Sequence, residues 1–319
     1  MFPQLQNKKI TIRQIDLEDD TYSLSPLKGI TLDEAFKESV CRVGVLHPPI
    51  VKEKAIDAFQ VVSGRKRLLA SRDLLSLTSC VCLVLPQDIP EVDIFTIIFE
   101  EIKSIRPPTT LEQAFFLHKV SNFLGKEELI EKILPRMGLP PHSYHIDQAL
   151  KLLDLEEPIL LGIQSGILHE RVAREMITLS FRDRISVFEI IDFLHFSSSN
   201  QIKFLNSCRD IAARNNESIA DFLNDKEFKH ILQHEKSNQP QKAVNVMSWL
   251  SAKKNPRYTE TEKTFNQLIA SMELPKHINV THTPFFENDI TTLKISFRDL
   301  EQFRKKWSKL KEVLDNEQN

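Results

Sequence analysis

The stretch that decides the fold of this chain reads GVLHPPIV at residues 44–51 and, after a short spacer, FQVVSGRKRLLA at residues 59–70. Each part contains a run of β-branched and other apolar residues. The second run stops at Gly64, before clustered cations and small helix formers. A pattern of this kind is typical of a strand, a tight turn and the first turn of a helix. The stretch therefore predicts strands that lead into a helix beginning directly after Gly64.

The turn GRKR at residues 64–67 has the composition of a binding site for phosphate groups. A helix start leaves backbone N–H groups unpaired, and a glycine lets the chain come close to an anion. Arg65, Lys66 and Arg67 would add three positive charges at the same place. As a bare pattern, the same residues also fit a solvated basic turn that has no ligand.

The two segments resemble the amino-terminal domain of the ParB-like partition-protein family. That family has a strand with glycine-x-x-x-proline-x-x-valine and a later strand that ends in glycine-x-arginine-arginine-x-x-alanine. The matching residues are Gly44, Pro48, Ile50, Val51, Gly64, Lys66, Arg67 and Ala70. The resemblance implies a small mixed-sheet domain of the ParB/sulfiredoxin type with a pocket for CTP and Mg²⁺, in which the second motif holds the phosphates.

The resemblance assigns cofactor binding to residues of both motifs, namely Gly44, His47, Pro48, Gly64, Arg65, Lys66 and Arg67. The sequence departs from the family at two of them. Arg65 stands where the family usually has an acidic or polar residue, and Lys66 replaces an arginine. Both residues of this chain are positively charged, so we expect attraction to phosphate to be retained.

Composition sets the outer limits of the interpretation. A chain of 319 residues with 41% hydrophobic content has room for two or three cores, and its seven glycines favour helices over a glycine-rich barrel or sandwich. It has no apolar run of about 18 residues and no secretion signal, so we expect a cytoplasmic protein without membrane contact. The resemblance implies association with the nucleoid. The four cysteines form no C-x-x-C pair, which favours reduced, structural thiols. A formal charge of −2 means that nucleic-acid binding would need a local basic patch.

The order of elements around the glycine turn predicts a small α+β domain over residues 1–106 with one mixed sheet. Residues 9–15 alternate like a first strand, and Thr31 with Glu34 has the spacing of a capping box that opens a helix. The helix after Gly64 should run to about Leu75. The apolar run at residues 80–85 should be the last strand, because Pro86 stops it.

A third motif of the family, glutamate-asparagine-x-glutamine-arginine, falls near Glu100. That glutamate matches, whereas Glu101, Lys103 and Ser104 replace the other three residues. Glu100 and Glu101 are the candidate metal ligands and catalytic residues, since carboxylate oxygens suit Mg²⁺. Two adjacent glutamates on a helix also fit a solvated face. Weak CTPase activity is implied by the resemblance, and the replacements leave it open.

Residues 107–234 are predicted to form a helical DNA-binding domain with a helix-turn-helix. An amphipathic helix at residues 129–137 ends at Gly138, and a second helix begins near Ser143. Short turns of this kind also occur in any helical bundle. The residues that follow resemble the central ParB segment at Leu150 to Leu155, Gly166, Leu168 and Ala173. That register makes residues 143–151 the recognition helix.

The candidate DNA-binding residues lie on this helix and on a later one. They are His142, Ser143, Tyr144, His145, Gln148, Lys151, Arg171 and Arg174. Gln148 can bond to an adenine edge and Lys151 to a guanine or a phosphate. Because the helix has few cations, we expect Arg171 and Arg174, with Arg182 and Arg184, to hold the DNA backbone. The four arginines also fit an ordinary exposed face.

Three further helices are expected at residues 186–196, 201–213 and 218–232, followed by a linker over residues 235–275 with one short helix at 264–272. Residues 276–319 have a pattern of their own. Two alternating segments flank a turn at residues 287–289, and apolar residues then repeat at Leu300, Phe303, Trp307, Leu310 and Leu314. A hairpin and one helix cannot bury such a seam alone, so it predicts a homodimer. The segment also resembles the carboxy-terminal dimerisation module of ParB.

The sequence is thus interpreted as an α+β, predominantly α protein: a ParB-like, sequence-specific binder of double-stranded DNA that acts as a dimer. The resemblance implies plasmid or chromosome partition or related regulation, gating by CTP, and a ParA-like ATPase as partner. One alternative is a nucleotide- or metal-dependent enzyme, a phosphotransferase or nuclease, on the same fold. Sulfiredoxin chemistry needs a cysteine where Arg65 stands. Another alternative is a DNA-binding adaptor that works without a nucleotide.

Overall fold

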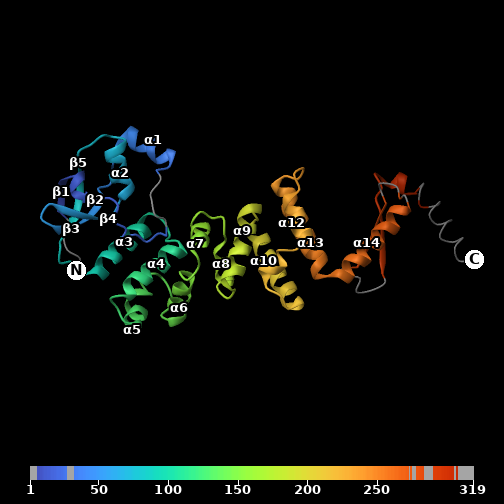
Figure 1. The fold of residues 1–319 in the computed structure, drawn as a ribbon. Helices are drawn as coiled ribbons and strands as arrows, with labels where there is room; N and C mark the ends of the chain where they lie inside the picture. Colours follow the sequence, from blue (N-terminus) through green and yellow to red (C-terminus); the bar gives the residue numbers. More distant parts are fainter. Residues whose placement is uncertain are drawn as a thin grey trace, which may run out of the picture. The chain divides into compact units, whose positions relative to one another are not determined.

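The computed structural model describes residues 6–26, 32–272, 274, 278–283, 290–304 and 307. These residues belong to two compact units, residues 1–202 and residues 203–319, which are described one after the other. Several positions named from the sequence lie outside the described residues: Thr31, Lys276, Leu310, Leu314 and the turn at residues 287–289. The fold class is confirmed, since the described elements are mostly helices with a small mixed sheet and a later two-stranded ribbon (Figure 1).

The sheet of the first unit has five strands in the order β1-β5-β3-β4-β2. They span Gln6–Thr11 (β1), Ile15–Asp16 (β2), Ile50–Ala55 (β3), Ala58–Ser63 (β4) and Ser79–Leu85 (β5). β5 runs antiparallel to β1 and parallel to β3, while β4 runs antiparallel to β3 and parallel to β2. The mixed sheet expected around the glycine turn is therefore present.

The predicted start of the domain needs three corrections. The strand expected at residues 9–15 is broken by a 3-10 turn at Ile12–Gln14. A straight strand would place Ile15 on the face opposite to Ile10 and Ile12, and the turn allows all three to enter one core. The strand expected from Gly44 begins at Ile50, because two prolines before it cannot donate ladder hydrogen bonds. Helix α1 spans Glu34–Val43, and its N-cap is Asp33, whose carboxylate accepts a hydrogen bond from the Phe36 N–H at 2.8 Å.

The two faces of the sheet pack into different cores. On one face, Val51, Phe59 and Val61 surround Leu68 of helix α2 (Arg65–Asp73). On the other face, residues of three strands pack with helix α3 (Glu91–Ile105). The alternation of Ile50 and Val51 between the two cores follows from the period of two along a strand. Helix α2 is thus fixed against the sheet at the point where the glycine turn begins.

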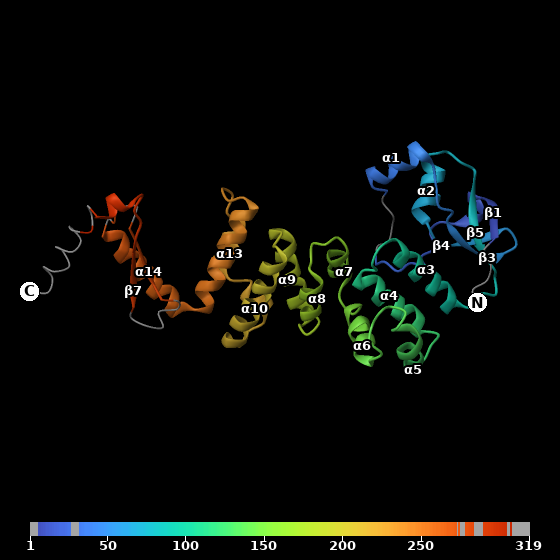
Figure 2. The same cartoon turned by 180° about the vertical axis from the view of Figure 1, so that it is seen from behind.

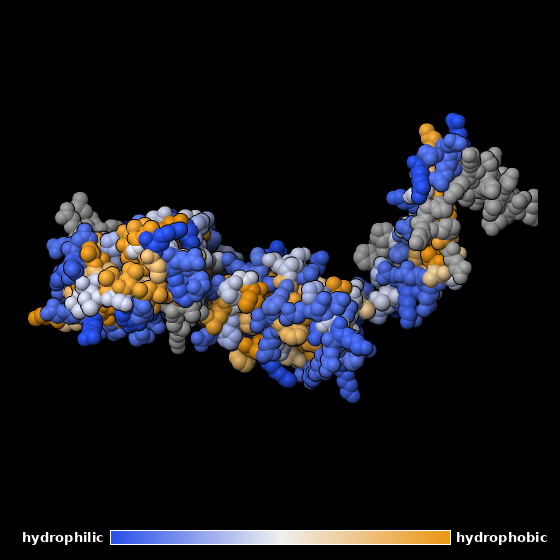
Figure 3. All heavy atoms as spheres, turned by 90° about the horizontal axis from the view of Figure 1, so that it is seen from above, coloured by the Kyte–Doolittle hydropathy of each residue, from blue (hydrophilic) through white to orange (hydrophobic). Residues whose placement is uncertain are grey.

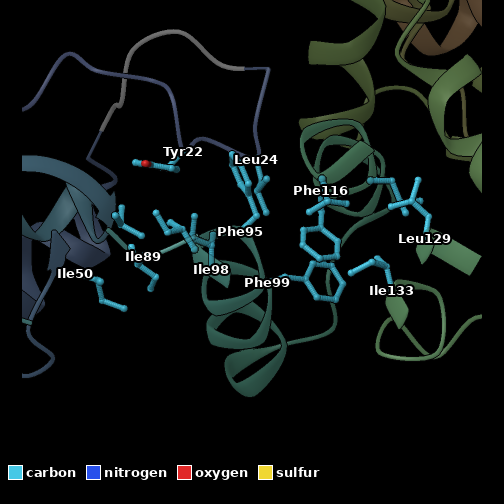
Figure 4. Close-up of a cluster of buried hydrophobic side chains, with 14 of the residues drawn as sticks. Tyr22, Leu24, Ile50, Ile89, Phe95, Ile98, Phe99, Phe116, Leu129 and Ile133 are labelled. Carbon is cyan, nitrogen blue, oxygen red and sulfur yellow. The ribbon is translucent and has the colours of Figure 1, made fainter. Parts of the chain in front are cut away.

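The second core continues into the helical region. It includes residues of helix α4 (Thr110–Ser121), of the π-helix η2 (Leu129–Ile133) and of helix α6 (Ser143–Leu152). Phe99 of α3 and Phe116 of α4 stack at its centre, with ring centroids 4.4 Å apart, as Figure 4 shows. This core extends across residue 106, the boundary expected between the first two domains. The boundaries at residues 106, 234 and 275 stay predictions.

Short helices complete the first unit: α5 (Lys126–Glu128), α7 (Glu157–Gln164), α8 (Glu170–Met176) and α9 (Phe181–Leu194), which Figure 2 shows from behind. Helix α9 begins earlier than the sequence suggests, because Ser180 caps it by accepting a hydrogen bond from the Asp183 N–H at 3.2 Å. Helix α10 (Ser198–Asn215) also starts before the expected residue 201.

The second unit contains more helix than expected. The single helix predicted at residues 218–232 is divided into α11 (Ile219–Phe222) and α12 (Lys226–Gln233) by the N-cap residue Asp225. The prediction of a linker with one short helix is wrong, since α13 (Gln239–Lys254) and α14 (Pro256–Ser271) each have 16 residues. Pro240 lies in the first turn of α13 after the N-cap Asn238, so it is a helix-start signal here.

The chain ends in the expected ribbon. β6 (Ile278–His282) and β7 (Thr291–Ile295) pair antiparallel, and residues 300–304 and 307 are helical. No helix in the described ranges is long and apolar enough to cross a membrane. On the face drawn in Figure 3, hydrophilic residues are interspersed with hydrophobic ones. All four cysteines are free; Cys41 is exposed and the other three are buried.

Candidate functional site

One side chain, Arg67, joins the three motifs that the sequence singled out. It lies in the first turn of α2, which begins after Gly64. Its Nη1 donates to the backbone carbonyls of His47 at 3.0 Å and of Pro48 at 3.1 Å. Its Nη2 donates to Oε1 of Glu101 on α3 at 2.9 Å. The loop before β3, the glycine turn and the third motif therefore meet at this guanidinium.

Gly64 is required at this turn for two reasons. Its φ of 87° is in the left-handed region, which residues with a Cβ atom rarely adopt. A Cβ built on Gly64 would also lie 2.7 Å from Nε of Arg67. The glycine therefore sets both the direction in which α2 starts and the position of the Arg67 guanidinium.

Replacement of Gly64 by alanine is expected to lower the free energy of unfolding by about 1–2 kcal/mol from the left-handed backbone alone. Displacement of Arg67 should add to this loss. Gly125→Ala is the matched control, because Gly125 has a φ of −69° and nothing within 4 Å of an added Cβ. Urea unfolding followed by circular dichroism measures both variants. Equal stabilities for the two would contradict the role given to Gly64.

The other two cations of the turn also face carboxylates. The Arg65 guanidinium contacts the Asp20 carboxylate and the Asp19 backbone carbonyl. Lys66 is less constrained, since its Nζ lies 3.8 Å from Asp33 and both side chains are half-exposed. Burial acts to raise the pKa of Asp19. Hydrogen bonds from Thr21 and Gln60 and the charge of Lys54 outweigh it, so the pKa of Asp19 is lowered and its carboxylate stays ionised.

The donors of this pocket fit an anion. A guanidinium fork binds carboxylate and phosphate oxygens with similar geometry, and Glu101 already supplies one such oxygen to Arg67. Arg65 and Arg67 are thus paired with the chain's own acids, and phosphate binding at this turn stays a prediction.

The two candidate metal ligands differ in their surroundings. Glu100 is exposed, whereas Glu101 is half-buried in its ion pair with Arg67. Successive residues of a helix are about 100° apart around its axis, so the two carboxylates diverge. Among the described residues, no group of three or more His, Cys, Asp or Glu side chains is placed to hold a metal. Metal binding and catalysis by this pair stay predictions.

The single helix expected at residues 129–137 is not observed, because η2 ends at Ile133, and the helix-turn-helix on residues 126–152 stays a prediction. A helical segment formed by α5 and η2 is followed by a turn, and α6 begins after His142. Ile146 and Leu152 are buried, so α6 is anchored by its apolar face. Of the six candidate residues on or next to α6, His142, Tyr144 and Lys151 are exposed, while Ser143, His145 and Gln148 are half-buried.

The charges around α6 favour a polyanion more than its sequence suggests. Asp147 is the acid on its outer face, and Lys126 of α5 pairs with it at 3.1 Å. Arg136, in the turn before Gly138, is exposed, and within the described ranges no ion pair forms with it or with Lys151. Sequence reasoning missed Arg136. Its position two residues before Gly138, in the expected turn, could have indicated that it lies next to α6.

A groove with a volume of about 830 Å³ runs beside α6. Helices α4, α6, α7 and α8 contribute to its lining, which includes Thr110, Tyr144, Gln148, Glu170, Arg171 and Arg174. Four of the predicted DNA-binding residues therefore share one concave surface. Acids of the same groove partly neutralise the charges of its arginines, because Arg174 pairs with Glu170 at 2.6 Å and Arg171 lies 3.9 Å from Glu175.

Two polar residues near this groove have structural roles. Arg184, which the sequence suggested as a backbone contact, is largely buried and pairs with Glu156 at 2.5 Å. The amide of Gln201 is also buried; it donates to the Ile167 carbonyl at 2.7 Å and accepts from the His169 N–H at 2.9 Å. Gln201, which sequence reasoning missed, therefore holds the start of α8 beside the groove.

Comparison with known proteins gives matches among solved structures only, since no protein-family model and no curated protein matches the chain. One match is C-terminally truncated chromosome-partitioning protein ParB from Caulobacter crescentus complexed to the centromeric parS site. It is 17% identical, covers 61% of this chain and 96% of its own, and has a TM-score of 0.34. The same protein complexed with CTP-gamma-S is 19% identical over 58% of this chain and 98% of its own, with a TM-score of 0.24. Both are ParB, the family that the sequence motifs resemble.

Proposed function

We propose that this chain is a sequence-specific binder of double-stranded DNA that reads the major groove with α6. The observation that carries the proposal is the arrangement of α6. Its apolar residues are anchored in the core that contains the Phe99–Phe116 stack, and Tyr144 and Gln148 line the groove shared with Arg171 and Arg174. A rigidly held helix with polar side chains on its outer face is the usual element for reading base edges.

Different residues of this surface would have different tasks. Gln148 presents an amide that can accept from and donate to one adenine. Lys151, Arg136 and the groove arginines would neutralise phosphates. Arg171 is three-quarters exposed and only loosely paired, so it is the more available of the two arginines. The chain's net charge of −2 makes this local patch the source of attraction to DNA.

Gln148→Ala is expected to cost about 1–3 kcal/mol of specific binding at one base position and to leave nonspecific binding nearly unchanged. Lys151→Ala should weaken binding to all sequences and reduce the salt slope by about one, because its contact would be to phosphate. The matched controls are Gln233→Ala and Lys229→Ala, which change exposed residues of α12. Fluorescence anisotropy at several salt concentrations separates the two effects. Unchanged affinity and preference in both α6 variants would contradict the assignment.

We also propose that the Gly64 turn binds a nucleoside triphosphate, CTP, with Lys66 and Arg67 on the phosphates and Mg²⁺ at Glu100 and Glu101. The sequence motifs and the anion-binding chemistry of Arg67 support this. CTP would supply a polyphosphate for the turn. Lys66 has the longest and most exposed ion pair of the three cations, so it is the most available to a phosphate. Isothermal titration calorimetry with CTP, with and without Mg²⁺ and DNA, tests the proposal. The absence of heat under all these conditions would refute it.

The third part of the proposal is a homodimer formed through the carboxy-terminal ribbon and helix, with a ParA-like ATPase as a further partner. Supporting it are large apolar side chains left open in that segment: Leu300 is 77% exposed, Leu293 is 54% exposed and Trp307 is 51% exposed. A second copy of the same surface would cover them and would bring two α6 helices to paired half-sites.

A further inference from the structure

The three ion pairs of the glycine turn differ in how closely they are held. Arg67 and Glu101 are each about one-fifth exposed, 20% and 23%. Asp20, the partner of Arg65, is 46% exposed, and the Lys66–Asp33 pair is longer and more open. Water screens the more exposed pairs more strongly. Of the three carboxylates, Glu101 is therefore the one that competes best with an incoming anion for its cation.

Both terminal nitrogens of Arg67 donate to protein oxygens. Its guanidinium donates to the carbonyls of His47 and Pro48 and to Glu101. The two carbonyls orient the fork and carry no net charge, so they leave its positive charge available to an anion. Among the described residues, Glu101 is the acidic partner that neutralises it. Removing the charge of Glu101 would therefore leave the guanidinium in place but without its counter-ion.

We propose that Glu101 is an autoinhibitory carboxylate, which occupies the phosphate-binding edge of Arg67 and must be displaced before a polyphosphate can bind. The proposal rests on the triphosphate site proposed above and adds its regulation. An uncharged amide in place of the Glu101 carboxylate would not compete with phosphate for the arginine in this way. Asp20 holds Arg65 in the same manner, with a more exposed carboxylate.

The test measures binding of sodium tripolyphosphate and of CTP to the full chain by calorimetry, with and without Mg²⁺. Glu101→Gln keeps the size of the side chain and removes its charge. Glu100→Gln is the matched control, because it makes the same change at the exposed neighbour. In the absence of Mg²⁺, where neither glutamate acts as a metal ligand, we expect Glu101→Gln to bind both ligands at least about tenfold more tightly than the unmodified chain, which corresponds to about 1.4 kcal/mol. Glu100→Gln should not gain affinity for tripolyphosphate.

Two outcomes separate this inference from the proposed CTP site. If Glu101→Gln gains affinity for tripolyphosphate and none for CTP, the autoinhibitory role is supported and the proposal that the site binds CTP is refuted. If Glu101→Gln and Glu100→Gln bind tripolyphosphate as the unmodified chain does, the autoinhibitory role is overturned, whatever the affinity for CTP. Circular dichroism and thermal unfolding confirm that each variant is folded. Asp20→Asn serves as a second variant and should give a smaller gain, because its ion pair is more exposed.

Discussion

Phe116→Ala is expected to lower the free energy of unfolding by about 3–5 kcal/mol, the usual range for removal of a buried phenylalanine ring. Phe116 is 1% exposed and stacks on Phe99 at 4.4 Å, so the deletion leaves a cavity between α3 and α4 (Figure 4). Both rings belong to the core that also contains Ile146 of α6. The loss should therefore affect the sheet domain and helix α6 together.

The matched control for this change is Phe123→Ala, one phenylalanine further along the chain. Phe123 is 52% exposed, and its ring lies 6.4 Å from Phe95 at the edge of the same core. Its removal should cost less than about 1 kcal/mol, in line with substitutions at exposed sites. Chemical unfolding of both variants measures the difference. Equal losses would show that the Phe99–Phe116 stack does not organise this core.

Deletion of residues 276–319 is expected to convert a dimer into a monomer and to weaken specific DNA binding about 100-fold, through loss of effective concentration at paired half-sites. The point variant Leu300→Asp should act in the same direction, since Leu300 is 77% exposed and would become buried in a dimer. Thr291→Asp, at an exposed polar position of β7, is the control. Sedimentation velocity at micromolar concentration measures the association.

The dimer proposal would fail in either of two ways. The full chain would sediment as a monomer at micromolar concentration, or the shortened chain would remain as dimeric as the full one. A loss of dimer without a loss of specific DNA affinity would retain the interface and contradict its link to half-site binding.

The sheet and the helix after Gly64 were predictable because local signals determine them. A glycine at positive φ, a helix start with cations and the apolar run at residues 80–85 each fix one element. The break at Ile12–Gln14 was not predictable from the alternation, since it depends on which residues share a core. Helix α13 was not predictable from local composition, because a polar segment that contains Pro240 resembles a linker, although proline is also favoured in the first turn of a helix.

The types of residue at the candidate sites were predictable from the sequence, but the ion pairs between them were not. The motifs placed Arg67 and Glu101 in one pocket, yet an ion pair between residues 34 positions apart depends on how α2 and α3 pack. In the same way, Lys126 changes the charge of α6 by pairing with Asp147, which α6 alone does not reveal. Sequence patterns predict which residues lie on a surface. The packing of the helices determines which of their charges are neutralised within the chain and which can bind a ligand.

The central claim is that α6 reads a specific DNA sequence. The most direct test is to incubate the purified full chain with fragmented genomic DNA from its host and to sequence the bound pool. The proposal predicts enrichment of one sequence class that contains an inverted repeat, and loss of that enrichment with Gln148→Ala. Uniform recovery of all fragments, or recovery of the same class by Gln148→Ala with unchanged enrichment, would contradict it.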